Sequence, residues 1–74
     1  MFIHAYKSRN RGNYHVAAFT YQKGMLEPMT NWCYQTFGHP GDCKDNARWE
    51  DSLWLGEAWF RDERDLIMFV LRWS

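Results

Sequence analysis

Apolar and polar side chains alternate along the first third of the chain. The alternation has a period of two over residues 2–7, and residues 14–21 are rich in β-forming types. Between these segments, residues 8–13 read SRNRGN, a polar run in which Gly12 is free to adopt a positive φ. The pattern predicts a β-hairpin over residues 2–22.

Residues 28–37 carry apolar side chains at helical spacing instead. Pro28 suits the first turn of a helix, Thr30 is an alternative N-cap, and Gly38 ends the segment. The apolar stripe consists of Met29, Trp32, Cys33 and Phe37. We predict a helix over residues 28–37, followed by a polar loop over residues 39–46.

A second hairpin is predicted over residues 47–60. It begins at Arg48–Glu50, has Gly56 near its bend and returns along Glu57–Phe60. The pattern leaves open whether Asp51–Leu55 continues the first of these strands or forms a longer loop.

We predict a second helix over residues 62–73, with Asp62 as its N-cap. Its apolar stripe is Leu66, Phe69, Val70 and Trp73. Ile67 and Leu71 widen the stripe and Met68 nearly closes it, which is typical of a helix buried on all sides. In a chain this short, one side would instead meet a partner or a second copy, unless Met68 is simply a partly exposed apolar residue.

Together these elements predict a single α+β domain over residues 1–74. We expect a two-layer sandwich in the order β-hairpin, helix, β-hairpin, helix, with an antiparallel sheet and both helices on one face. The chain has 74 residues and includes five Trp, four Tyr and five Phe. Because each ring can bury about 150–250 Å², a few of them can build the core of so small a domain.

Charge and hydropathy narrow the functional classes. The net charge is zero, with four basic side chains against one acid in residues 1–37 and five against eight in residues 38–74. This balance argues against a strong non-specific nucleic-acid binder and against an acidic DNA mimic. The longest apolar run, Leu66–Leu71, is far short of the roughly 20 residues that span a bilayer, and no signal peptide is recognisable. We therefore expect a cytoplasmic protein with reduced cysteines and no membrane partner.

Neither a metal site nor a catalytic centre is favoured. Cys33, His39 and Cys43, with Asp42 or Asp45, have the residue types of a zinc site, but the gaps between them do not match the paired spacing of structural zinc ligands. The chain has no nucleophile elbow and no Gly-rich phosphate loop. We expect no cofactor, no metal and no enzymatic activity.

Three tryptophans form the first candidate binding surface. Trp49, Trp54 and Trp59 lie within eleven residues and are interspersed with acidic side chains. Exposed Trp with an acidic rim is typical of a protein-binding hot spot, and Met68 is a further candidate for partner binding. Because Trp59 and Phe60 point to opposite faces of a strand, the alternative is a second small core behind the sheet.

The first hairpin is the alternative binding surface. Its positive charge and its rings are the combination that single-stranded nucleic acids bind, although a hairpin tip also needs charge for solubility. The candidate nucleic-acid-binding residues are Tyr6, Lys7, Arg9, Arg11, Tyr14 and His15.

Residues 28–74 contain aromatic positions in a fixed order. They read WCYQTFG at 32–38, RW at 48–49, WFRDE at 59–63, Asp65, and FVLRW at 69–73. In this order the chain resembles a set of short bacteriophage proteins, including ones of cyanophage and T4-like type. The resemblance implies phage origin and transfers no catalytic residue, and short non-structural phage proteins commonly bind and redirect host proteins.

We therefore expect a phage-encoded interaction protein that acts in the host cytoplasm. It would bind and modulate a host macromolecular machine without catalysis. The alternative is a small nucleic-acid-binding module that uses the first hairpin, and a minor virion or assembly component is a third possibility. A host protein is the expected partner, and a second copy of the chain is a further candidate.

Overall fold

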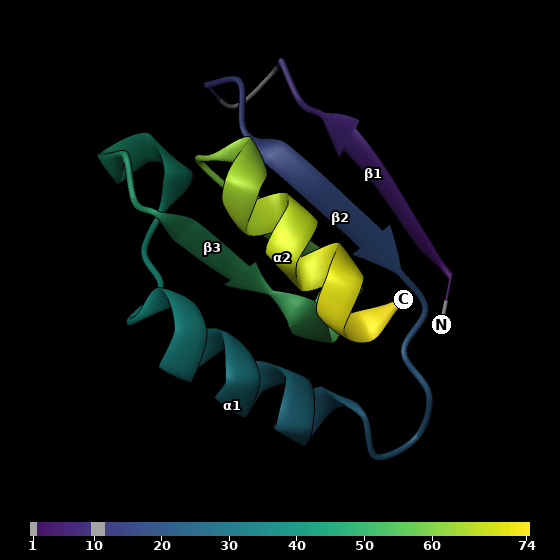
Figure 1. Cartoon of the computed structure of the whole chain (residues 1–74). Coiled ribbons are helices and arrows are strands. Elements are labelled where there is room, and N and C mark those ends of the chain that lie inside the picture. Colours follow the sequence, from purple (N-terminus) through teal and green to yellow (C-terminus); the bar gives the residue numbers. More distant parts are fainter. Residues whose placement is uncertain (1, 10–11) are drawn as a thin grey trace.

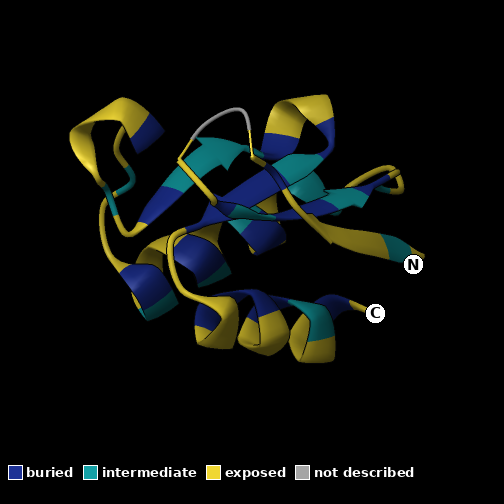
Figure 2. Ribbon diagram, turned by 90° about the horizontal axis from the view of Figure 1, so that it is seen from above, coloured by how far each residue is buried: buried dark blue, intermediate teal, exposed yellow. Residues whose placement is uncertain are grey.

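The computed structural model describes residues 2–9 and 12–74, which form an α+β two-layer sandwich (Figure 1). Its elements are β1 (Ile3–Lys7), β2 (His15–Phe19), α1 (Leu26–Phe37), β3 (Trp49–Ser52), β4 (Glu57–Phe60) and α2 (Glu63–Trp73). The strands form one antiparallel sheet in the order β1-β2-β4-β3. Both helices lie on the same face of this sheet (Figure 2). The predicted fold class, order of elements and placement of the helices are therefore confirmed.

The main core lies between the sheet and the two helices. At the centre of the sheet Ala17 pairs with Ala58, and both are fully buried. The ring of Phe69 in α2 lies 5.6 Å from the rings of both Phe19 and Phe60, measured between centroids. Small side chains at the centre and large ones around it let α2 lie close to the two middle strands.

α1 begins two residues earlier than predicted, at Leu26. Pro28 still lies in the first turn, where its missing N–H has no helical acceptor to satisfy. Thr30 is not an N-cap, because it lies inside the helix and its Oγ1 donates a hydrogen bond to the Leu26 carbonyl at 2.8 Å. Met29, Cys33 and Phe37 are buried along the predicted stripe.

α2 is buried on one side only, in agreement with the expectation that so short a chain does not enclose a helix on all sides. Asp62 occupies the N-cap position, but its side chain makes no capping hydrogen bond. Ile67, Met68 and Leu71 are 49%, 39% and 77% exposed. The reason is the two-layer architecture, in which a helix contacts the sheet with one face and has no layer above the other. At 12 and 11 residues, α1 and α2 are too short to cross a membrane, and the described residues contain no other candidate span.

A second, smaller core lies behind the sheet. It consists of Tyr14, Val16, Cys43 and Trp59. The loop before β3 supplies Cys43 through a short 3₁₀ turn, Cys43–Asp45. Trp59 and Phe60 therefore point to opposite faces as predicted, with Phe60 under the helices and Trp59 in the second core.

Candidate functional site

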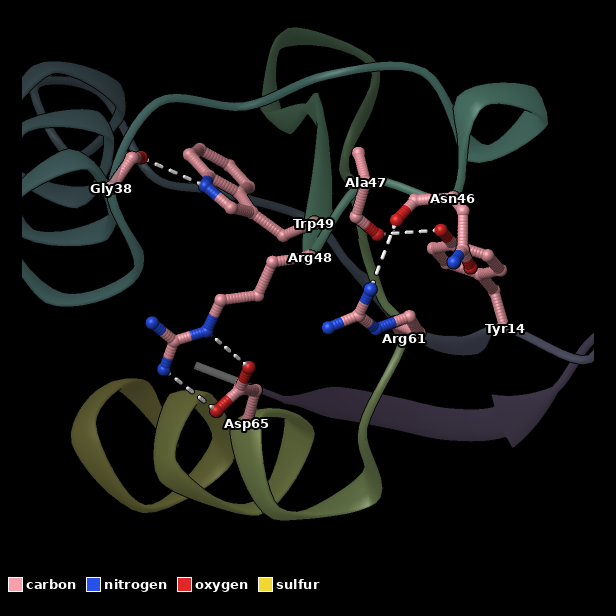
Figure 3. Close-up of polar contacts among 8 residues, drawn as sticks. All are labelled: Tyr14, Gly38, Asn46, Ala47, Arg48, Trp49, Arg61 and Asp65. Atoms are coloured by element: carbon pink, nitrogen blue, oxygen red, sulfur yellow. Dashed lines mark hydrogen bonds and ion pairs between the residues drawn. The ribbon is translucent and has the colours of Figure 1, made fainter.

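Two of the three candidate tryptophans are structural. Trp49 is fully buried on the helix side of β3, and its Nε1 donates a hydrogen bond to the Gly38 carbonyl at 2.9 Å (Figure 3). Trp59 is only 8% exposed. Neither side chain offers the open surface that a hot spot requires, because each fills one of the two cores. Trp54 alone of the three retains that exposure.

Trp54 and Leu55 project from the turn between β3 and β4. We call residues Leu53–Gly56 the tip turn. It is a single 3₁₀ turn, Leu53–Leu55, closed by Gly56. Trp54 is 64% exposed and Leu55 is 62% exposed, whereas Leu53 between the strand and these residues is fully buried. The sequence pattern left this segment undecided between strand and loop; the strand ends at Ser52 and the turn begins at the next residue.

Hydrogen bonds within the tip turn fix its backbone. The Gly56 N–H donates to the Leu53 carbonyl at 2.9 Å, and the Leu53 N–H donates to Oδ1 of Asp51 at 3.1 Å. Gly56 has φ +82°, in the left-handed region that glycine adopts without strain. The buried Leu53 side chain anchors the same segment in the main core.

Two further hydrogen bonds attach the tip turn to the end of β2. The Phe19 N–H donates to the Gly56 carbonyl at 2.8 Å, and the Tyr21 hydroxyl donates to the Trp54 carbonyl at 3.0 Å. The backbone of Phe19 lies so close that a Cβ added to Gly56 would come within 2.4 Å of the Phe19 carbonyl oxygen. Two exposed apolar side chains thus stand on a backbone held from several directions.

The exposed side of α2 is a second apolar surface. Ile67 and Leu71 are one helical turn apart, Met68 lies beside them, and all three are exposed. Arg64 and Arg72 are exposed on the same helix. The structure therefore makes Met68 accessible, as a partner-binding residue must be, and adds Ile67 and Leu71, which had been assigned to the buried stripe.

An ion pair fastens β3 to α2. Nε of Arg48 donates to Oδ2 of Asp65 at 2.8 Å, and a second guanidinium nitrogen donates to Oδ1 at 3.2 Å (Figure 3). The Asp65 side chain is 1% exposed, and the Arg48 guanidinium also lies 5.4 Å from the centre of the Phe37 ring. These hydrogen bonds to Asp65 raise the pKa of Arg48. The sequence showed Asp65 only as an acid in the first turn of a helix, so this structural role was missed.

The candidate nucleic-acid-binding residues do not gather on one surface. Tyr14 is 2% exposed, and its hydroxyl donates to the Ala47 carbonyl at 2.5 Å (Figure 3). Burial, together with nearby Cys43 and acidic side chains, raises the pKa of the Tyr14 hydroxyl. Lys7 pairs with His15 on the helix side of the sheet, whereas Tyr6 points to the opposite side.

The remaining residues of that candidate surface do not restore it. Tyr6 is 39% exposed, but burial and a hydrogen bond with Glu57 raise its pKa, so an acid stands beside it. A carboxylate at this place repels a phosphate backbone. Arg9 is exposed, and Arg11 lies outside the described residues.

The residues weighed for a zinc site lie apart. Cys33 belongs to the main core and Cys43 to the second core on the other side of the sheet, and the two are not joined by a disulfide. Burial raises the pKa of the Cys33 thiol to about 12, which keeps it protonated and unreactive near neutral pH. His39 is exposed and its ring lies against Tyr34. Among residues 2–9 and 12–74, no three His, Cys, Asp or Glu side chains are grouped to hold a metal ion.

The comparisons with known proteins add no relative to this description. No protein-family model matches the chain, and neither a curated protein sequence nor a solved structure is similar to it.

Proposed function

We propose that this protein is a non-catalytic binding module that attaches to a protein partner through the tip turn. The observation that carries the proposal is that the four-residue tip turn combines exposed apolar side chains with a fixed backbone. Trp54 and Leu55 are exposed, while the backbone that bears them is fixed by hydrogen bonds to Phe19 and Tyr21.

The physical chemistry of protein interfaces supports this role for Trp54. Truncation of a central Trp at an interface typically costs 2 kcal/mol or more, because the ring fills a pocket and is fully desolvated there. A preorganised loop loses little conformational entropy on binding, so more of that energy remains as affinity. An exposed Trp on a floppy loop would lack this advantage.

The resemblance to short bacteriophage proteins supports a host protein as the partner. The module would act in the host cytoplasm by occupying a site on a host machine and would need no turnover. An apolar pocket wide enough for an indole ring is the feature we expect on that partner.

Nucleic-acid binding is the weaker alternative. The rings and charges assigned to it are divided between two sides of the sheet, and Tyr14 is buried. Salt-sensitive retention on a single-stranded DNA column that is lost on replacing Arg9 would nevertheless favour it over the tip turn.

The test is affinity capture from a lysate of the infected host, followed by a binding measurement with the partner identified. We expect Trp54→Ala to weaken binding about 30-fold or more, the equivalent of about 2 kcal/mol. Phe2→Ala is the matched control, because Phe2 is an apolar ring that is 84% exposed at another place on the surface.

Circular dichroism of both variants checks that the fold is retained. A partner that binds the Trp54→Ala and wild-type proteins equally well, with the fold intact, contradicts the proposal. Loss of binding in Met68→Ala but not in Trp54→Ala would assign the site to α2 instead.

A further inference from the structure

One edge of the sheet is unpaired among the described residues. β1 is the outermost strand (Figure 1), and no strand of the described residues pairs with its outer side. The opposite edge, β3, is approached by the preceding loop, where the Gly41 N–H donates to the Trp49 carbonyl at 3.0 Å. The four residues from His4 to Lys7 are all exposed. β1 contains no proline and only one charged residue among its five, so little of the usual protection of an edge strand is present.

The hydrogen bonding of the first hairpin fixes which groups face outward. The Ser8 N–H donates to the Tyr14 carbonyl at 2.8 Å, so this pair is hydrogen-bonded within the hairpin. In an antiparallel pair such positions alternate. The pairs of His4 and Tyr6 with β2 are therefore also hydrogen-bonded, and the N–H and C=O groups of Ile3, Ala5 and Lys7 point away from the sheet.

We propose that this edge pairs with the same edge of a second copy, which joins two sheets into one across β1. The two β1 strands would run antiparallel with Ala5 opposite Ala5 of the other copy. Ile3 of each copy would then lie opposite Lys7 of the other. In this register all outward N–H and C=O groups of the three residues find partners.

Other symmetric registers use the edge less well. Centring the pair on His4 or on Tyr6 leaves one of the three outward-facing residues opposite a position beyond the strand. Centring it between two residues places outward groups opposite inward ones, which forms no ladder. The geometry of the hairpin therefore selects the register centred on Ala5.

The side chains are compatible with that register. Lys7 lies opposite Ile3 of the other copy, so no like charges face each other and the lysine stem covers an apolar neighbour. On the other side of the sheet, Tyr6 lies opposite His4 of the other copy. Their rings already lie 5.6 Å apart within one strand, and aromatic cross-strand pairs stabilise antiparallel sheets. A second copy satisfies this edge better than an arbitrary peptide, because charge, rings and hydrogen bonds all match under the twofold axis.

Cross-linking tests the register directly. Opposite Cα atoms in a hydrogen-bonded antiparallel pair are about 5.5 Å apart, within the range of a disulfide. We expect purified Ala5→Cys to form covalent dimers under mild oxidation. Lys7→Cys is the matched control, because the two copies of residue 7 would be offset by four residues, about 14 Å along the strands. The native Cys33 and Cys43 are buried and do not interfere.

Light scattering supplies the second measurement, with no binding partner present. We expect the wild-type protein to approach twice its 9.0 kDa chain mass as its concentration rises to about 1 mM, because edge interfaces are small and weak. Ala5→Pro should remain monomeric and folded, since its missing N–H is an outward one.

A wild-type protein that stays monomeric over that range, or an Ala5→Cys protein that cross-links no better than Lys7→Cys, overturns the proposal. Dimers that persist in folded Ala5→Pro and dissociate in Met68→Asp would move the interface to α2 and overturn it equally. If Ala5→Pro fails to fold, the cross-linking result decides alone. None of these outcomes bears on the tip turn, so the two proposals fail independently.

Discussion

The two hairpins of this sheet both contain aromatic residues, but they are held very differently. In the second hairpin, the three residues Ala58–Phe60 of β4 are all buried, and the tip turn is attached to the end of β2. In the first, four of the five residues of β1 are exposed and its outer edge is unpaired among the described residues. The second hairpin is part of the frame of the molecule, while β1 is attached to that frame from one side.

This difference separates two ways of presenting a binding surface. The tip turn offers side chains on a fixed backbone, which suits recognition of a pocket. The edge of β1 offers the backbone itself, which suits pairing with another strand. Exposure alone would not have distinguished the two, because Trp54 in the tip turn and Tyr6 in β1 are both accessible rings.

The largest effect on stability is expected from removing a buried ring of the second hairpin. Trp49→Ala should lower the free energy of unfolding by about 3–5 kcal/mol, because it leaves a cavity in the main core and an unpaired carbonyl at Gly38. Urea unfolding followed by circular dichroism measures the change. Trp54→Ala in the tip turn is the control, and its effect should stay within about 0.5 kcal/mol because the ring is mostly exposed. Equal losses in the two variants would refute the division into structural and accessible tryptophans.

A smaller loss is expected from the ion pair that ties the second hairpin to α2. Arg48→Ala should lower the free energy of unfolding by about 2–4 kcal/mol, because it leaves the buried carboxylate of Asp65 without its bidentate partner. The estimate is below that for a fully buried pair, since the Arg48 side chain is 43% exposed and water can reach the site.

A double variant separates the ion pair from simple loss of packing. Arg48→Met combined with Asp65→Leu should recover most of the stability in urea unfolding, since it removes both charges and keeps apolar volume. A double variant that is no more stable than Arg48→Ala would mean that the charges themselves are not what holds β3 to α2.

The fold was predictable because the glycines that end helices and form turns lie where the apolar periodicity changes. Gly38 and Gly56 mark the end of α1 and the bend of the second hairpin, and each adopts the positive φ that such positions favour. The buried stripes of both helices also followed from their spacing. What the sequence left open was whether the last apolar side of α2 is covered or exposed. An apolar sequence shows that a side chain is able to be buried, but the number of layers decides whether a second surface is there to cover it.

The candidate site was predicted only in part, for a related reason. Three residues of the same type lie in one short segment, Trp49, Trp54 and Trp59. Whether each is buried or exposed depends on the strand register and on where β3 ends. The alternation did predict that Trp59 and Phe60 point to opposite faces of the sheet. It gave no sign that the loop around Cys43 folds back to cover Trp59, because that contact joins residues distant in sequence.

The smallest test compares one glycine in the connection of each hairpin. Gly12 and Gly56 have φ values of +75° and +82°, so alanine at either position adopts an unfavourable left-handed conformation. At Gly12 the added Cβ would meet, among the described residues, the Tyr14 ring at 3.9 Å, an ordinary contact, and the cost should be about 1 kcal/mol. At Gly56 it would also overlap the Phe19 carbonyl oxygen, and the cost should rise to about 2–3 kcal/mol.

Thermal and urea unfolding of Gly12→Ala and Gly56→Ala measure this difference, with the wild-type protein as reference. The φ values of the two glycines are similar, so the excess cost at Gly56 reports how tightly the tip turn is pressed against β2. If that excess is present, Gly56→Ala should also weaken partner binding more than Gly12→Ala does, because the Trp54 ring would be displaced from its fixed position. If both alanines cost the same, the tip turn has room to shift, and Trp54 loses the rigidity on which its role as a preorganised anchor depends.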